Sequence, residues 1–342
     1  MSTETNTQVV LAPRPQGYPQ PPDFDVVNTP LLPLKDGEAR VRNLVLSMDA
    51  GFRHWMDAGS GDDYLPEMPL GAAVMGLTVG EIVESRHQTW RVGDHVMGRL
   101  AWERFSTIGT QRGDEFLTRV PDNPAFPLRC YLGILGGTGM TAYFGVTDIC
   151  QPRPDDVFVV SAAAGAVGNV AGQIARLRGA RVIGITGTDA KCEGLMDLGF
   201  DAAVNHRDPG GLDQALSAVL DNDDGIDAYF DNVGGSTLNT VLRKLNTHAR
   251  VALCGAIASY GVRDTPGPSN MFEMVTRRVR LQGFMYTDMI ERYDEASRQL
   301  TTWLRDGQLT NAEYVLHGIE NAGNAFCDMF AGKNFGKTVV EL

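Results

Sequence analysis

Cysteine is scarce in this sequence of 342 residues: there are five, an odd number, and no two form a C-x-x-C pair. A disulfide framework is therefore not expected, and a reducing compartment, the cytoplasm, fits better. Basic residues are also in the minority, with 30 Lys and Arg against 42 Asp and Glu and a net charge of −12. No general affinity for nucleic acid or for an anionic membrane is expected, because both carry negative phosphates.

The sequence also lacks a clear targeting or membrane segment. Its N-terminus has no basic start followed by an apolar stretch, so no signal peptide is predicted. Residues 157–175 carry no charge and are long enough to span a bilayer, but three glycines and the polar Ser161, Asn169 and Gln173 interrupt them. A buried strand, a turn and a helix are expected here instead.

Two domains are expected, because the chain exceeds the size of one comfortable core. Residues 1–23 are rich in Pro, Gln and Thr and are expected to run as an extended arm. Up to about residue 130, candidate strands at 38–48, 74–84 and 91–99 with Gly and Pro turns are typical of a small β-rich barrel. The C-terminal FGKTVVEL resembles a strand of the same kind. We therefore predict a β-rich substrate domain from 1–130 with 305–342, and a nucleotide domain over 131–304.

From about residue 131, helices and strands alternate. The candidate strands are 157–160, 181–185, 202–205, 228–231 and 250–254, and the candidate helices are 169–178, 189–198, 212–220, 238–245 and 293–305. Such alternation predicts an α/β domain with a parallel, doubly wound sheet of the Rossmann type.

A glycine-rich turn, A-A-A-G-A-V-G at 162–168, follows a buried strand and precedes a helix. Glycine lets the backbone turn tightly and approach a pyrophosphate, and the helix N-terminus offers free N–H groups. The usual fingerprint is G-x-G-x-x-G, and here Ala163 replaces its first glycine while Gly165 and Gly168 remain. The turn could instead merely pack a helix on a sheet, but the strand–turn–helix–strand context favours a dinucleotide site.

The end of the next strand discriminates between cofactors. NAD-binding chains usually carry Asp or Glu there to hold the ribose 2′-hydroxyl, and this chain has Thr-Gly-Thr at 186–188. The missing carboxylate and the nearby Lys191 favour a 2′-phosphate, and hence NADPH. Lys191 could also be a solvated lysine early in a helix. His206 and Arg207, after the following strand, could join the same pocket or face water.

Eight segments together resemble a known family. They are LSMDAGFR (46–53), GTGMTAYFGV (137–146), SAAAGAVGNVAGQIA (161–175), LGFDAAVNH (198–206), YFDNVGG (229–235), CGAIASY (254–260), RLQGF (280–284) and GKNFGK (332–337). They are similar to the zinc-independent medium-chain dehydrogenases/reductases that include leukotriene B4 12-hydroxydehydrogenase/prostaglandin reductase, plant alkenal double-bond reductases and bacterial curcumin reductase. The resemblance covers nearly the whole chain. It implies a Rossmann domain, a GroES-like barrel domain and NADPH, and we expect a homodimer.

The resemblance also implies site residues. It places Gly165, Ala166, Val167 and Gly168 against the pyrophosphate. It places Lys191 on the adenosine 2′-phosphate and His206 where many relatives have a tyrosine near that phosphate. The further residues that it places along the cofactor are Asn232, Cys254, Gly255, Ala256, Ile257, Ser259, Tyr260, Phe284, Met285, Tyr286 and Asn334.

No metal is expected. Zinc-dependent relatives carry Gly-His-Glu on a strand where this chain has Val-Met-Gly-Leu at 74–77, and the six histidines show no ligand-like spacing. Without a Lewis acid, the chemistry that remains is hydride addition to an activated C=C, as in an α,β-unsaturated carbonyl compound. A small-molecule enone or enal is therefore the expected substrate.

Tyr260 is the candidate catalytic residue, because a phenol can donate to an enolate oxygen directly or through the cofactor ribose. Alternatively, Tyr260 only packs against the ribose. Phe52, Tyr64 and Met274 could wall an apolar substrate pocket, although single apolar side chains of this kind are more often core. Phe52 stands near the place where relatives commonly have a tyrosine, with an alignment that is ambiguous by one residue. The alternatives to enone reduction are a quinone reductase and a non-catalytic NADPH-binding protein.

Overall fold

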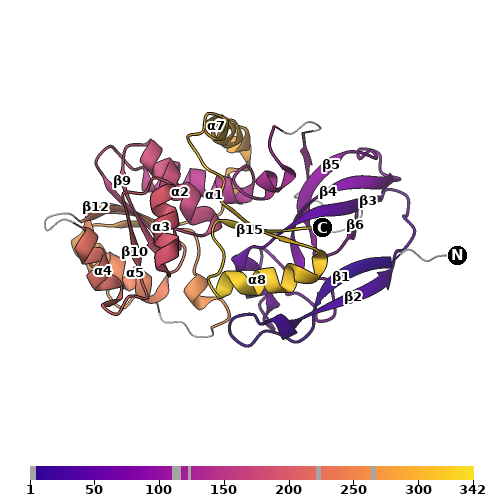
Figure 1. Cartoon of the computed structure of the whole chain (residues 1–342), viewed down its shortest axis with the longest axis horizontal. Helices are drawn as coiled ribbons and strands as arrows, with labels where there is room; N and C mark the ends of the chain where they lie inside the picture. Colours follow the sequence, from indigo (N-terminus) through magenta and orange to yellow (C-terminus); the bar gives the residue numbers. More distant parts are fainter. Residues whose placement is uncertain (1–4, 110–116, 122–124, 221–224, 263–266) are drawn as a thin grey trace. The chain divides into compact units, whose positions relative to one another are not determined.

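The computed structural model of the chain describes residues 5–109, 117–121, 125–220, 225–262 and 267–342, which are the coloured parts of the ribbon in Figure 1. The chain divides into two compact units. Unit 1 comprises Met1–Gly133, Tyr314–Lys333 and Thr338–Leu342. Unit 2 comprises Ile134–Glu313 and Asn334–Lys337.

In the C-terminal part of the chain, the boundaries between the two units differ from the predicted domain boundaries. The sequence assigns residues 305–313 and 334–337 to the β-rich domain, but both segments belong to unit 2. Hydrogen bonds explain the difference. Thr310 N donates to Gln173 Oε1 at 2.7 Å, and Gln173 Nε2 donates back to Thr310 O at 3.1 Å. Gly336 N donates to Ala164 O at 2.8 Å.

Unit 1 is rich in β-structure. Its strands are β1 (Thr5–Leu11), β2 (Phe24–Pro30), β3 (Ala39–Ser47), β4 (Met75–Ser85), β5 (His95–Ala101), β6 (Phe105–Ile108), β7 (Thr118–Val120), β14 (Glu313–His317) and β15 (Lys337–Glu341). Its helices are α8 (Ala322–Phe330) and short 3-10 turns, among them η2 (Ala50–Met56). Strands β1 and β2 pair with each other, while the larger sheet has the order β14-β15-β3-β4-β5-β7, with β6 on β3. Most of its pairs are shown to be antiparallel, as the turn-rich sequence predicts.

Two details of unit 1 differ from the sequence-based expectation. Residues 5–11 are not a free arm: they form β1, and the side chains of Val9, Val10 and Leu11 are buried. Residues 1–4 lie outside the described part of the chain. The strand expected at 91–99 begins only at His95, because Gly93 turns with a φ of 92°.

Unit 2 contains one parallel sheet of six strands in the order β10-β9-β8-β11-β12-β13. The strands are β8 (Val157–Val160), β9 (Arg181–Thr186), β10 (Ala202–Asn205), β11 (Ile226–Asp231), β12 (Leu245–Leu253) and β13 (Arg280–Gly283). The helices are α1 (Gly137–Phe144), α2 (Ala166–Leu177), α3 (Asp189–Asp197), α4 (Gly211–Val219), α5 (Gly235–Leu242), α6 (Met271–Thr276) and α7 (Tyr293–Arg305), with a π-helical turn at Gly145–Cys150 after α1.

Helices cover both faces of this sheet, so the predicted doubly wound fold is confirmed. Side chains of α4 and α5, such as Leu216 and Leu238, form one core cluster with Val159 and Ile183. Gly184, the neighbour of Ile183 on β9, faces the other side and approaches Leu195 of α3. The chain runs from β8 outward to β9 and β10, and then returns to β11 on the opposite side of β8. The point where the strand order reverses therefore lies between β8 and β11.

Several predicted bounds agree with the structure to the residue: those of β8, β10 and α7. The predicted helix stops are also found, since Gly179 and Gly199 have φ values of 86° and 85° just after α2 and α3. Strand β13 is not predicted, because it has only four residues and carries no run of apolar side chains. The uncharged segment 157–175 forms β8, a turn and most of α2, a helix of 12 residues. Within the described ranges, no helix has the length and apolar character needed to cross a membrane.

Candidate functional site

The predicted cofactor residues gather at one edge of the parallel sheet in unit 2. All six strands run in the same direction, so their carboxyl ends meet at that edge. The turn at 161–165 follows β8, Asn232 follows β11, the loop 254–260 follows β12, and His206 follows β10. In open α/β sheets, this edge is where ligands bind, next to the point where the strand order reverses.

The glycine-rich turn packs tightly on the start of α2. Gly165 is the N-cap residue and has no side chain, so no side chain caps the first N–H groups of α2. A Cβ on Gly168 would overlap the Ala162 carbonyl oxygen and lie 2.8 Å from Ala163 Cα. The absence of a side chain at Gly168 therefore brings the helix N-terminus close to the turn, with free N–H groups on Ala166 and Val167 that can face an anion.

A buried carboxyl group connects the turn after β8 with the turn after β11. Asp231 is fully buried, and its Oδ1 accepts hydrogen bonds from Ser161 Oγ at 2.8 Å and Tyr229 OH at 2.7 Å. The N–H groups of Val233 and Gly234 also donate to Oδ1, each at 3.0 Å. This network fixes the backbone on both sides of Asn232 in the DNVGG turn.

Asn232 itself bridges the same two strand ends. Its Nδ2 donates to Ser161 O at 2.7 Å, and its backbone N donates to Ser161 Oγ at 2.9 Å. Sequence reasoning selected Asn232 but not Ser161, Tyr229 or Asp231. Polar side chains at the ends of apolar strands were the signal that could have found them, because buried polar groups need partners.

The loop 254–260 after β12 is held against the Asn232 turn. Cys254 N donates to Asp231 O at 2.8 Å, and Ile257 N donates to Asn232 O at 3.2 Å. Ser259 closes the short 3-10 turn η6 (Ile257–Ser259) by donating from N and Oγ to Ala256 O. Burial raises the pKa of the Cys254 thiol to about 12, so this sulfur is a protonated packing group.

Tyr260 ends this loop and turns its hydroxyl back over it. The Tyr260 hydroxyl oxygen accepts a hydrogen bond from Ala256 N at 3.3 Å, and a Cβ on Gly255 would lie 3.4 Å from it. Burial raises the pKa of the Tyr260 phenol, an effect that the Ala256 hydrogen bond opposes. The phenol therefore keeps its proton at neutral pH, and the geometry leaves that proton free to be donated.

The C-terminal segment that belongs to unit 2 reaches the glycine-rich turn through Gly336, two residues after Asn334. Asn334 is buried, and its Nδ2 donates to Gly336 O at 3.2 Å. Gly336 forms a parallel bridge with Gly165, and Phe335 packs on Gly194 of α3. The structure thus brings together four segments that are far apart in the sequence: 161–168, 232, 254–260 and 334.

His206 and Arg207 lie beside Gly187 at the ends of β9 and β10, and Lys191 of α3 is close enough to Arg207 to feel its charge. A Cβ on Gly187 would lie 3.1 Å from His206 Nε2 and 3.4 Å from Arg207 Nε. His206 N donates to Thr186 O at 2.9 Å, which fixes this segment against the end of β9. Burial, and then the Arg207 charge, lowers the pKa of both Lys191 and His206.

Phe284, Met285 and Tyr286 follow β13 at the far end of the same edge. Phe284 packs edge-on against Phe230 at 6.2 Å and lies close to Gly145. Tyr286 stacks on Tyr293 at 6.0 Å, with its ring against Gly137 at the start of α1. Met285 is 41% exposed. Tyr286 thus contacts α1 and α7, whereas Phe284 packs between β11 and the turn that follows α1.

The three candidate substrate residues fall into different units. Phe52 and Tyr64 belong to unit 1, where both rings contact Trp55, with centroids 6.1 and 5.7 Å away. Met274 belongs to unit 2 and packs on the core cluster beneath α4 and α5. Phe52 and Trp55 are likewise partly buried against a core cluster of unit 1, so Phe52, Tyr64 and Met274 all stay predictions as substrate contacts.

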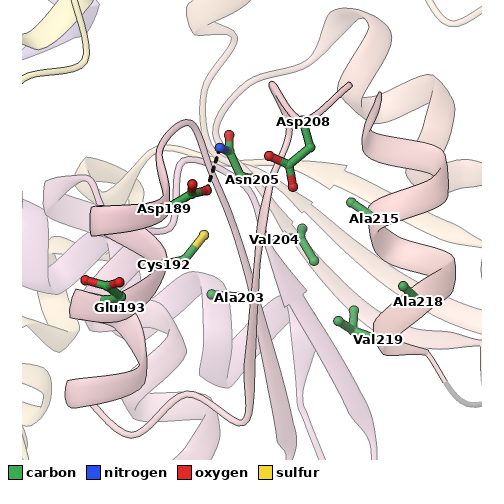
Figure 2. A pocket seen from close by; sticks show the side chains of 10 residues that line it. All are labelled: Asp189, Cys192, Glu193, Ala203, Val204, Asn205, Asp208, Ala215, Ala218 and Val219. Carbon is green, nitrogen blue, oxygen red and sulfur yellow. Dashed lines mark hydrogen bonds between the residues drawn. The ribbon is translucent and has the colours of Figure 1, made fainter. Parts of the chain in front are cut away.

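A pocket of about 370 Å³ lies on edge strand β10 between α3 and α4 (Figure 2). Asp189, Glu193 and Asp208 contribute carboxylates to it, and Asn205 Nδ2 donates to Asp189 Oδ1 at 2.9 Å. Burial, and then these carboxylates, raises the pKa of the Cys192 thiol that lines it. The acidic lining disfavours a phosphate here. The pocket is therefore separate in character from the cationic cluster at Gly187.

Across the residues that the structure describes, no three His, Cys, Asp or Glu side chains are grouped so that they could hold a metal ion. The expected absence of a metal stays a prediction.

The chain matches a family described as the N-terminal domain of oxidoreductase over residues 7–115, and one described as zinc-binding dehydrogenase over residues 166–302. It is 36% identical to the NADPH-dependent curcumin reductase of Escherichia coli (strain K12), over 99% of this chain and 97% of that protein. It is 35% identical to the 2-alkenal reductase (NADP(+)-dependent) of Nicotiana tabacum, over 98% of this chain and 97% of that protein. The crystal structure of CurA in complex with NADPH from Vibrio vulnificus has 36% sequence identity to the chain and superposes with a TM-score of 0.89, covering 98% of each chain. The chain therefore belongs to the medium-chain dehydrogenase/reductase family of NADP-dependent oxidoreductases that contains these reductases.

Proposed function

We propose that the chain reduces the C=C bond of α,β-unsaturated carbonyl compounds, that is 2-alkenals and enones, with NADPH as the reductant. The observation that carries this proposal is the loop 254–260, which holds the Tyr260 hydroxyl beside Gly255 at the ligand-binding edge of the sheet. The similar proteins of E. coli and tobacco are named for the reduction of curcumin and of 2-alkenals.

Along the carboxyl edge of the parallel sheet, the residues follow the same order as the parts of NADPH that they would bind. At the ends of β9 and β10, Lys191 supplies positive charge for the 2′-phosphate, and residues 186–188 supply no carboxylate that would repel it. At the end of β8, Gly165 and Gly168 leave the N-terminus of α2 open for the pyrophosphate. The loop 254–260 and Asn334 then flank the path toward the ribose and the nicotinamide.

When bound, NADPH supplies a hydride from nicotinamide C4 to the β-carbon of the substrate. Negative charge then moves to the substrate carbonyl oxygen, and the site must hold that charge and deliver a proton. Tyr260 suits this role, because its oxygen already accepts from Ala256 N and its own proton remains to be donated. One matched family is described as zinc-binding, but we assign no step to a metal.

The cysteines and the exposed edge of unit 2 bear on the cellular compartment and the oligomeric state of the enzyme. The five cysteines are free thiols, which suits a reducing compartment such as the cytoplasm. We also propose a homodimer, because β13 is an edge strand of the sheet and α6 leaves Phe272 and Val275 74% and 67% exposed. Light scattering after gel filtration tests this, and a monomer mass at every concentration would contradict it.

The experiment that tests the proposed reaction follows NADPH oxidation with a 2-alkenal, with a quinone and without an acceptor. Reduction of the alkenal to the saturated aldehyde, with deuterium from labelled NADPH at the β-carbon, is the expected result. Turnover of the quinone alone would identify a quinone reductase. Tight NADPH binding without any turnover would identify a non-catalytic binding protein.

A further inference from the structure

Asp231 places a carboxylate in the interior of unit 2, at the end of β11. Its side chain is fully buried, and its Oδ1 accepts from Ser161 Oγ, Tyr229 OH and the N–H groups of Val233 and Gly234 at 2.7–3.0 Å. Its Oδ2 accepts from Gly234 N at 3.2 Å. The two N–H groups can only donate, and between them they face both oxygens. This arrangement suits the ionised side chain, because a protonated acid would need an acceptor for its own proton.

The Asp231 charge has no cationic partner in the described part of the chain. No Lys, Arg or His nitrogen there lies within 4 Å of its oxygens, and the ion pairs of unit 2 use other carboxylates, such as Asp156 with Arg250. A buried charge that is held by neutral donors alone keeps much of its field, because the interior of a protein screens a charge less than water does. Asp231 is therefore a source of negative potential inside unit 2.

The carboxylate belongs to the residue that holds the loop 254–260. Cys254 N and Gly255 N both donate to Asp231 O, at 2.8 and 3.1 Å. The next residue, Asn232, connects this strand end to the turn after β8 by donating from Nδ2 to Ser161 O at 2.7 Å. The charge thus lies next to the two segments that, in the proposed function, flank the ribose and the nicotinamide of the cofactor.

We propose that the buried Asp231 carboxylate stabilises the positively charged nicotinamide ring of NADP+ and so makes bound NADPH a stronger reductant. This inference rests on the proposed use of NADPH. Hydride transfer breaks the C–H bond at nicotinamide C4, forms one at the substrate β-carbon and leaves the oxidised ring with a positive charge. A fixed anion nearby lowers the free energy of that cation but has little effect on the neutral ring of NADPH. Asp231 is in this sense a positioning residue, since it acts through its field.

The test measures the Kd of NADP+ and of NADPH by calorimetric titration at pH 7.5. Their ratio reports how strongly the protein favours one ring over the other, whereas losses of folding or of phosphate contacts affect both constants alike. Asp231→Asn removes the charge and keeps an acceptor oxygen. At an effective dielectric constant of about 20, a unit charge about 15 Å away changes such a ratio by about fivefold. The ratio of the Kd of NADP+ to that of NADPH should therefore rise about fivefold or more.

A second neutral variant guards against a folding defect in Asp231→Asn. In Asp231→Ser, the smaller side chain leaves room for a water that accepts from the same donors. The ratio should rise in this variant by a similar factor. Thermal unfolding monitored by circular dichroism shows which of the two variants is folded at the temperature of the titrations.

Two further variants separate the charge from the hydrogen bonds. Tyr229→Phe removes one donor and keeps the carboxylate, so the ratio should stay within about twofold even where both constants rise. Asp227→Asn removes the same charge at the other end of β11, where the carboxylate is partly exposed and accepts from Val157 N at 2.9 Å and Asn246 Nδ2 at 2.8 Å. Solvent screens that position, so the ratio should again stay within about twofold.

An unchanged ratio in the folded neutral variants, with both constants rising in parallel, would overturn the inference and leave Asp231 a purely structural residue. The proposed reaction would stand in that case, because the wild-type protein would still bind NADPH and reduce a 2-alkenal. An equal rise of the ratio in Asp227→Asn would also overturn it, since the effect would then not depend on the buried position. A wild-type protein that binds neither NADPH nor NADP+ would overturn the proposed function as well.

Discussion

Replacing Asp231 by alanine should destabilise unit 2 strongly, because this side chain is the common acceptor of the network between β8 and β11. Four donors converge on its Oδ1: Ser161 Oγ, Tyr229 OH and the N–H groups of Val233 and Gly234, at 2.7–3.0 Å. Asp231, Ser161 and Tyr229 are all fully buried, so water cannot take over the lost role without opening the structure.

The loss of unfolding free energy in Asp231→Ala can be worked out from the hydrogen-bond donors that are left without an acceptor. A buried hydroxyl that loses its acceptor costs about 1–3 kcal/mol. The hydroxyls of Ser161 and Tyr229, with the two N–H groups, therefore sum to about 3–5 kcal/mol once limited additivity is allowed for. In a unit of this size, that loss lowers the melting temperature by about 6–20 °C. Asp231→Asn keeps an acceptor oxygen in place of Oδ1 and should lose clearly less.

The decisive experiment measures the melting temperature of the double variant Asp231→Ala/Tyr229→Phe by circular dichroism. Tyr229→Phe alone removes one hydrogen bond and should cost about 1 kcal/mol. In the Asp231→Ala background, the Tyr229 hydroxyl has already lost this acceptor and keeps only its interaction with Ser161, so the same change should cost clearly less than it does in the wild-type protein. An equal cost of Tyr229→Phe in both backgrounds would show that the hydroxyl does not depend on Asp231, and the assignment of the network would be refuted.

Four further predictions concern the proposed site. Tyr260→Phe keeps the ring and removes the hydroxyl, so kcat with a saturating enone should fall about a hundredfold with NADPH affinity unchanged if Tyr260 donates the proton; a wild-type kcat would reduce it to a packing residue. Lys191→Ala should weaken NADPH binding by about 1.5–3 kcal/mol and leave NADH nearly unchanged, as measured by fluorescence titration; an equal loss for both would remove Lys191 from the phosphate. Gly168→Ala should lower the melting temperature, because its Cβ would overlap backbone atoms of Ala162, whereas Gly165→Ala meets a single contact at 3.1 Å and should affect cofactor binding more than stability. Dialysis against a strong chelator should leave the enone reductase rate unchanged; activity that is lost and then restored by zinc would contradict the prediction that the chain has no metal site.

The sequence predicts the fold of unit 2 well, because the signals there are local. Apolar runs such as Val157–Val160 and the glycines that follow α2 and α3 fix where elements begin and end. The sequence does not predict strand β13, because its four residues carry no local strand pattern and form a strand only by pairing with β12. The assignment of residues 334–337 to unit 2 likewise depends on a distant partner, the bridge between Gly336 and Gly165.

The candidate site was predictable where a residue type has one chemical use, and less so where its role depends on a partner. A lysine after a strand without a carboxylate indicates a phosphate, so Lys191 could be proposed from the sequence. Asp231 and Ser161 give no such signal, since their importance lies in a hydrogen bond across 70 residues of sequence. Phe52 and Met274 are predicted substrate contacts because they are apolar, and the structure packs both, partly buried, against core clusters, a placement that suits a core side chain and a pocket wall equally.

The one departure from the dinucleotide fingerprint has a structural explanation. Ala163 stands where the first glycine is usual, and its methyl group is fully buried, pointing toward β9 rather than toward the ligand edge. The space that it needs is provided by Gly184, where a Cβ would lie 3.0 Å from the methyl carbon of Ala163. The left-handed turn that glycine would supply is made by the preceding Ala162, which has a φ of 48°. Ala163 is therefore accommodated by Gly184 on the neighbouring strand β9, and its methyl group points away from the N-terminus of α2.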